Sequence, residues 1–110
     1  MKTVQVAIHD PEFADSIRNL LIRDGGHTVH LVERPDPALE GVIVVEATHL
    51  NGLPQLSNER ERLVVMVRKE HDDLYKIWEA GVRHVVFHGD SPHMARVVVL
   101  GVELSLRSTA

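Results

Sequence analysis

Histidine and acidic side chains are the residues of this sequence whose types and positions could do chemistry. The chain has eight histidines and no cysteine, so it can form neither a disulfide nor a thiolate zinc site. Five of the polar residues stand at or just past the ends of short apolar segments: His9, Asp10, Glu46, His49 and His88. Imidazole and carboxylate groups that converge could bind Zn²⁺ or Ni²⁺. Their spacing matches no known ligand motif, so we favour scattered polar histidines over a metal site.

The apolar segments next to these residues predict five β-strands. They are short and rich in valine, and they cover residues 4–8, 28–32, 42–45, 63–67 and 85–87. The segments at 42–45 and 63–67 are apolar throughout, which is typical of central strands in a parallel sheet. Apolar residues with helical spacing predict three helices: one through Phe13, Ile17, Leu20 and Leu21 that ends at Gly25-Gly26, one over 71–80, and one that begins at Ser91-Pro92.

Strands that alternate with helices predict one α/β domain over residues 1–110. Five strands in this rhythm favour a flavodoxin-like, doubly wound parallel sheet with the order 2-1-3-4-5. Only Glu33 to Gly41 separates the second strand from the third, which is short for a helical crossover. The second helix is therefore expected to be shortened or absent.

The order and spacing of these elements resemble the receiver domain of bacterial two-component response regulators, over nearly the whole chain. Residues 79–88, with the sequence EAGVRHVVFH, look like the helix ending and fifth strand that lead to a Lys in receivers. Residues 40–46 look like the third strand, which in receivers ends at the phosphorylated Asp. His9 and Asp10 stand where the family has an acidic pair. The resemblance implies a signalling domain, and the lack of cysteine and of a long apolar segment after Met1 predicts a cytoplasmic location.

The resemblance also implies what chemistry the chain has lost. Receivers hold Mg²⁺ with the acidic pair and the acceptor Asp, and they hold the phosphoryl oxygens with a Thr or Ser after strand four and a Lys after strand five. Here the positions that match this site are His9, Asp10, Glu46, Val67, Arg68 and His88. Asp10 alone keeps the family's residue type. We therefore interpret the chain as an atypical member, a pseudo-receiver that is not an enzyme, is not phosphorylated and needs no cofactor.

Two interpretations of Glu46 remain at this stage. It could act as a built-in phosphomimic, or it could be a solvated acidic residue at a strand end. A carboxylate carries about one charge, where a phosphoryl group carries roughly −1.5 to −2 with three acceptor oxygens. Because the positions that match the Thr and the Lys of receivers hold other residues here, little is left to bind that charge, and we favour the solvated residue.

The function that follows is phosphorylation-independent protein interaction in signal transduction or transcriptional regulation. The alternatives are a small-ligand or metal-binding domain that uses the carboxyl-end edge of the sheet, and a transferase subunit that passes phosphate through His9. The formal charge of −4 argues against direct binding of nucleic acid, and no apolar run reaches the length of a membrane span. A DNA-binding output domain beyond residue 110 is compatible with the resemblance.

The last helix carries more apolar residues than one sheet-facing stripe can bury. We expect the surplus to meet a second copy of the chain, through strands four and five and the last two helices. The predicted interface residues are Met94, Val98, Val99 and Val102. Trp78, with Leu74 and Tyr75, either joins such a partner face or packs on the sheet.

Overall fold

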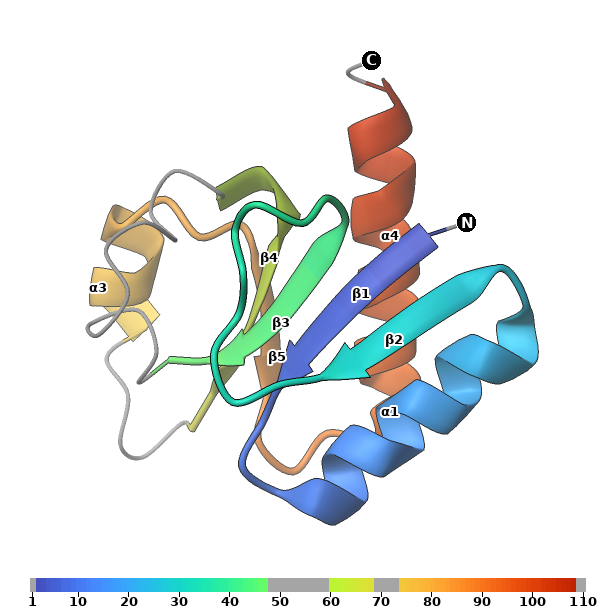
Figure 1. The fold of residues 1–110 in the computed structure, drawn as a ribbon. Helices are drawn as coiled ribbons and strands as arrows, with labels where there is room; N and C mark the ends of the chain where they lie inside the picture. The colour runs from blue at the N-terminus through green and yellow to red at the C-terminus, as the bar shows by residue number, and fades with distance from the viewer. Residues whose placement is uncertain (1, 48–59, 69–73, 109–110) are drawn as a thin grey trace.

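The computed structural model describes residues 2–47, 60–68 and 74–108. Along these residues the elements are β1 (Lys2–Ala7), α1 (Pro11–Asp24), β2 (His27–Leu31), β3 (Val42–Glu46), β4 (Leu63–Val67), α3 (Leu74–Glu79), β5 (His84–Phe87) and α4 (Pro92–Ser108). The five strands form one parallel sheet with the order β2-β1-β3-β4-β5 (Figure 1). The predicted flavodoxin-like arrangement and its strand order are confirmed. Within the described residues, no helix has the length and apolar character needed to span a membrane.

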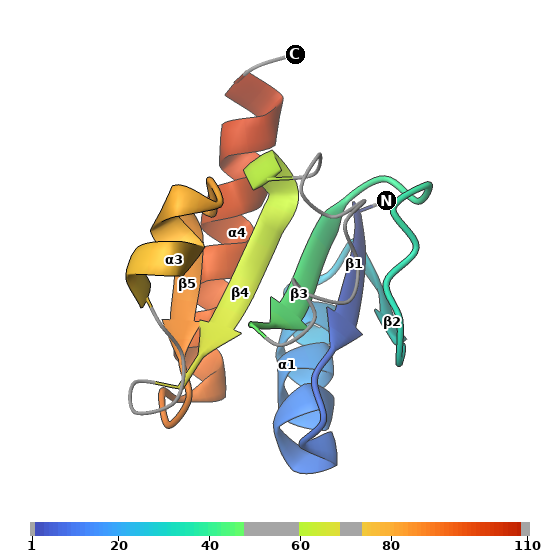
Figure 2. The same cartoon turned by 90° about the vertical axis from the view of Figure 1, so that its left-hand side faces the viewer.

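Helices α1 and α4 cover one face of the sheet, and α3 lies on the other (Figures 1 and 2). Successive side chains of a strand point to opposite faces. In β3, therefore, Val42 and Val44 pack into the core beneath α1 and α4, while Ile43 and Val45 pack into the core beneath α3. All five side chains of β4 are buried as well. These two central strands are apolar on both faces because both faces are covered.

No helix forms between β2 and β3, as the short spacing predicted. Two side chains hold this connection instead. The side chain of Gln5, 1% exposed in β1, donates from Nε2 to the carbonyl of Asp36 at 2.9 Å and accepts from the Asp36 amide at 2.7 Å. The guanidinium of Arg62 donates to the carbonyls of Pro37, Leu39 and Gly41. Backbone groups that a helix would satisfy internally are thus bonded by side chains from elsewhere in the chain.

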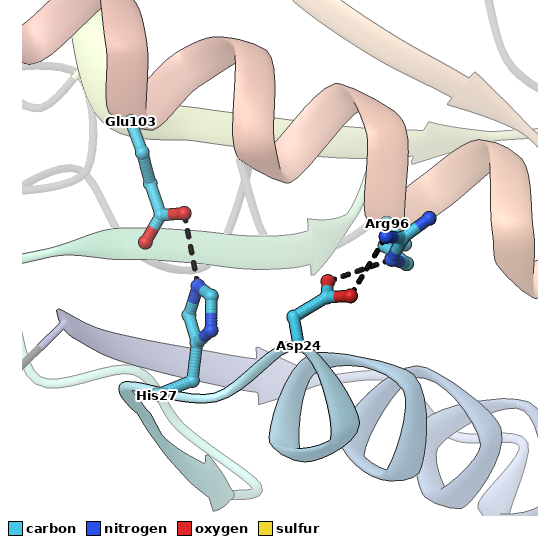
Figure 3. A network of polar contacts seen from close by, with 4 residues as sticks. All are labelled: Asp24, His27, Arg96 and Glu103. Atoms are coloured by element: carbon cyan, nitrogen blue, oxygen red, sulfur yellow. Dashed lines mark hydrogen bonds and ion pairs between the residues drawn. The ribbon is translucent and has the colours of Figure 1, made fainter.

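Two polar pairs fix the rotation of α4 against the first third of the chain (Figure 3). Arg96 donates to both carboxylate oxygens of Asp24, at 2.6 and 2.7 Å, and so ties α4 to the end of α1. Seven residues further along α4, Oε1 of Glu103 lies 3.0 Å from Nε2 of His27 at the start of β2. This second pair is almost fully buried, with side-chain exposures of 2% for the histidine and 9% for the glutamate. Because seven residues are two helical turns, both contacts lie on the same flank of α4.

The Asp24–Arg96 pair should make stability depend on pH. The hydrogen bond from Arg96 holds the pKa of Asp24 below its ordinary value. A depressed folded-state pKa contributes stability that is complete above the pKa of an unfolded Asp and is lost as the pH falls through the folded value. We therefore expect Asp24→Asn to lose less stability than the unmodified chain between about pH 5 and pH 2 in urea titrations. Asp15→Asn, which removes an exposed pair with Arg18 on the same helix, is the control. Equal acid sensitivity of the Asp24 variant and the unmodified chain would contradict this role.

The structure corrects the predicted interface on the last helix. Val99 and Val102 are both 0% exposed and belong to the core beneath α1 and α4, so they cannot line a surface. Val98 is partly buried and packs against the same core. Met94, the fourth predicted residue, is half exposed. The apolar residues that α4 presents to solvent are instead Met94, Val97 and Leu104.

Candidate functional site

The candidate site is a cavity at the carboxyl ends of the strands. It has a volume of about 330 Å³ and is lined by residues at or just past the ends of β1, β3, β4 and β5. This is the edge where open α/β sheets bind ligands. Apolar side chains contribute to the lining at Ile8, Phe13 and Met66. The polar and charged lining residues are His9, Asp10, Glu46, Arg68, His88 and Asp90.

Five of the six positions predicted for the altered receiver site lie together in this cavity. They are His9, Asp10, Glu46, Arg68 and His88. The sixth, Val67, is fully buried in the core on the α3 face and does not line the cavity. The carboxyl-end edge thus gathers five of the six residues, while Val67, the last residue of β4, packs into the core.

Glu46, at the end of β3, is held by the loop after β1. Its Oε1 accepts a hydrogen bond from the backbone amide of His9 at 2.6 Å, and the same oxygen lies 2.8 Å from Nδ1 of the His9 ring. The glutamate side chain is 20% exposed, whereas that of His9 is 82% exposed. Thus one residue binds the Glu46 carboxylate twice, through its backbone and through its ring. The interpretation of Glu46 as a carboxylate that only water surrounds does not describe this position.

Asp10 is the N-cap residue of α1. Its Oδ1 accepts from the amides of Glu12, at 3.0 Å, and Phe13, at 3.3 Å, and so caps the helix. Pro11 occupies the first helical turn, where its missing N–H costs no hydrogen bond. The sequence Asp-Pro before an apolar periodic segment is a helix-start signal. It would have identified the cap without a structure.

Asp90 completes the acidic part of the cavity, and the sequence analysis missed it. Its Oδ2 accepts from the amide of Phe87 at 2.9 Å, and its own amide donates to the Phe87 carbonyl at 3.0 Å. These bonds close the turn after β5, in which Gly89 has a φ of 102°. The amide of His88 donates to the carbonyl of Val67 at 2.8 Å and extends the β4–β5 pairing by one bond. Asp90 is recognisable in sequence only as a Gly-Asp turn signal.

Each of the three carboxylates in the cavity, those of Asp10, Glu46 and Asp90, accepts a hydrogen bond from a backbone amide of the chain. Mg²⁺ and Ca²⁺ need several oxygen ligands, and zinc sites need three or four convergent ligands. Among residues 2–47, 60–68 and 74–108, no group of three or more His, Asp or Glu side chains is placed to hold a metal ion. His49, one member of the predicted metal alternative, lies outside these residues. Within the described lining, no side chain carries a hydroxyl or a lysine ammonium.

Helix α3 presents aromatic side chains to the surface. It buries Ile77 against the sheet and leaves Tyr75 and Trp78 exposed. Ile77, and not Trp78, is therefore the residue of α3 that is buried against the sheet, and about half of the Trp78 side chain remains in contact with solvent.

Comparison of the chain with family models, with curated proteins and with solved structures gave no match.

Proposed function

We propose that the chain is a pseudo-receiver, a receiver-like domain that works as a protein-interaction module in signal transduction without being phosphorylated. One observation carries the proposal. The carboxylate at the acceptor position, Glu46, has an oxygen engaged by both the backbone and the ring of His9. In a phosphorylated receiver the acceptor oxygen must instead be presented to phosphorus beside a metal ion.

The other groups around Glu46 support the same function. Asp10 gives Oδ1 to the first turn of α1 and thus acts as a helix cap. His88 stands where receivers carry the Lys that binds a phosphoryl oxygen, and Arg68 follows β4 where they carry a hydroxyl. The edge of the sheet is therefore tied together by internal hydrogen bonds. A site held in one state by its own side chains suits a domain whose partner binds constitutively.

A second candidate function is the binding of a small ligand in the same cavity. Its volume of about 330 Å³ lies at the lower end of the range typical of ligand pockets. Three apolar and six polar or charged side chains line it, so a ligand that fits would itself carry polar groups. Saturable stabilisation of the chain by a small molecule, lost on changing Met66 to Trp to fill the cavity, would favour this candidate over the interaction module.

Treatment with acetyl phosphate and Mg²⁺ is expected to leave the chain unmodified. One oxygen of the Glu46 carboxylate is engaged by His9, and the described lining offers neither a second acidic residue free of backbone bonds nor a lysine. Intact-mass spectrometry checks this directly, with an unrelated phosphorylatable receiver as the control for the reagent. A stoichiometric, hydroxylamine-labile adduct that disappears in Glu46→Gln would overturn the proposed function.

A further inference from the structure

The solvent-facing side of α4 carries an apolar stripe. Met94, Val97 and Leu104 are 50%, 55% and 62% exposed, and Gly101 lies between the second and the third. The steps along this series are three, four and three residues, which keeps all four positions on one side of a helix. We call these four residues the α4 stripe. The spacing is that of the a and d positions of a coiled-coil seam.

The α4 stripe has no charged residue within it. Between Pro92 and Leu106 the charged residues are Arg96 and Glu103, and both face α1 and β2, where they pair with Asp24 and His27. A quarter of the chain is charged, so an exposed helix face without charge is unusual for it. A strongly charged partner, such as a nucleic acid or an anionic membrane, would find no counter-charge here. A second copy of the chain brings no like charges and no unpaired charge to be buried.

Gly101 has no explanation in the part of the chain that the structure describes. Glycine in the middle of a helix costs about 1 kcal/mol relative to alanine. Its backbone is not among the glycines with positive φ, and a Cβ built at this position would meet nothing within 4 Å. Within the described residues, neither backbone conformation nor packing therefore requires a glycine. A missing side chain on an exposed, apolar helix face does allow the backbone of another helix to approach closely.

We propose that the α4 stripe is the contact between two copies of the chain, whose α4 helices cross at Gly101. A two-fold axis at this point places the two glycines opposite each other, with Val97 and Leu104 on either side of the crossing. The dimer proposal rests on the proposed function, because it identifies a second copy of the chain as the partner of the interaction module. A single helix crossing buries less than the roughly 800 Å² per partner of a standard interface. We therefore expect a weak dimer whose population rises with concentration.

The decisive variant is Gly101→Leu, because a general apolar contact and a close crossing predict opposite results for it. Leucine is a better helix former than glycine and should raise the melting temperature of the monomer by about 4 °C. It also adds apolar surface, which would tighten a contact that depended on apolar area alone. If the helices cross at Gly101, the added side chains separate the backbones, and we expect the dimer to weaken at least tenfold.

The measurement is sedimentation equilibrium of the whole chain over a concentration series, with melting curves of the same samples. Val97→Glu should give a folded monomer at all concentrations. Ile22→Glu on α1 introduces the same charge at a residue that is 53% exposed and should leave dimerisation unchanged. Tighter association of Gly101→Leu, an effect of Ile22→Glu as large as that of Val97→Glu, or an unmodified chain that stays monomeric at millimolar concentration would each overturn this proposal. None of these results touches the phosphorylation test, so the two proposals fail separately.

Discussion

Replacing Val99 with Glu is expected to abolish folding, whereas the same replacement at Val97, two residues earlier, is expected to leave the domain folded. Val99 is 0% exposed and belongs to a core cluster with Ile17, Leu21 and Val44. A carboxylate at this position would be buried without a partner, at a cost of several kcal/mol. Domains of this size are stable by only about 5–15 kcal/mol. Val97 is 55% exposed, so a carboxylate there stays in water.

Circular dichroism and urea unfolding of the two variants test this pair. The Val99 variant should show no cooperative transition at neutral pH, while the Val97 variant should unfold within about 1 kcal/mol of the unmodified chain. A Val99→Glu chain that melts cooperatively near the unmodified value would mean that α4 is rotated differently on the sheet. The Arg96 and Glu103 contacts would then be wrong as well, because they lie on the same helix.

Gln5→Glu is expected to destabilise the domain strongly at neutral pH and much less in acid. The amide of Gln5 is 1% exposed, and its Nε2 donates to the carbonyl of Asp36. A carboxylate in its place has no proton to donate and faces that carbonyl in a buried site. Burial raises the pKa of such a carboxyl group. A raised folded-state pKa means that stability is present below the unfolded value, near pH 4.3, and is lost as the pH rises through the folded value.

The comparison variant for this prediction is Gln5→Leu, which has a similar size and does not titrate. It should lose about 2 kcal/mol through the two missing hydrogen bonds to Asp36, to the same extent at every pH. The difference between the two variants in urea unfolding should therefore grow from about pH 4 to pH 7. If the two lose stability in parallel across this range, the Gln5 side chain does not hold the β2–β3 connection in the way described.

The elements of this fold follow from local patterns, and for that reason they were predictable. Uninterrupted valine-rich segments gave β3 and β4, because strands with helices on both faces have no polar side. Ser91 before Pro92 marked the start of α4, where Ser91 Oγ accepts from the Met94 amide at 3.4 Å. The interval between β2 and β3 was too short for a helix, and none formed.

The rotation of α4 was not predictable from its own residues. Val97 to Leu100 are four consecutive apolar residues, and such a run has no periodicity that would indicate which of them meets the sheet. The rotation is set by Arg96 and Glu103, whose partners lie 72 and 76 residues earlier in the chain. Contacts over such separations leave no local pattern. The predicted interface therefore included two core residues.

The location of the cavity was predictable from the sequence, but the hydrogen bonds among its lining residues were not. The carboxyl ends of parallel strands lie at the same edge of the sheet, so the residues at or just past the ends of β1, β3, β4 and β5 lie close together. Which donors the carboxylates meet depends on the backbone of the connecting loops. The His9–Glu46 contact spans 37 residues, and nothing in either segment indicates it. The helix cap made by Asp10 and the turn closed by Asp90 are local and could have been found.

The contacts of α4 with the first third of the chain also determine when the protein can fold during its synthesis. Its core residues, Ala95, Val99 and Val102, close a cluster that begins with Val4 and Val6 of β1. A ribosome must therefore have released the chain through Leu106 before this face of the sheet is covered. Until then β1 and α1 expose apolar surface that no later strand can cover, because β3, β4 and β5 extend the sheet sideways. The apolar surface of β1 on this face is therefore covered only once α4, the last element of the fold, is in place.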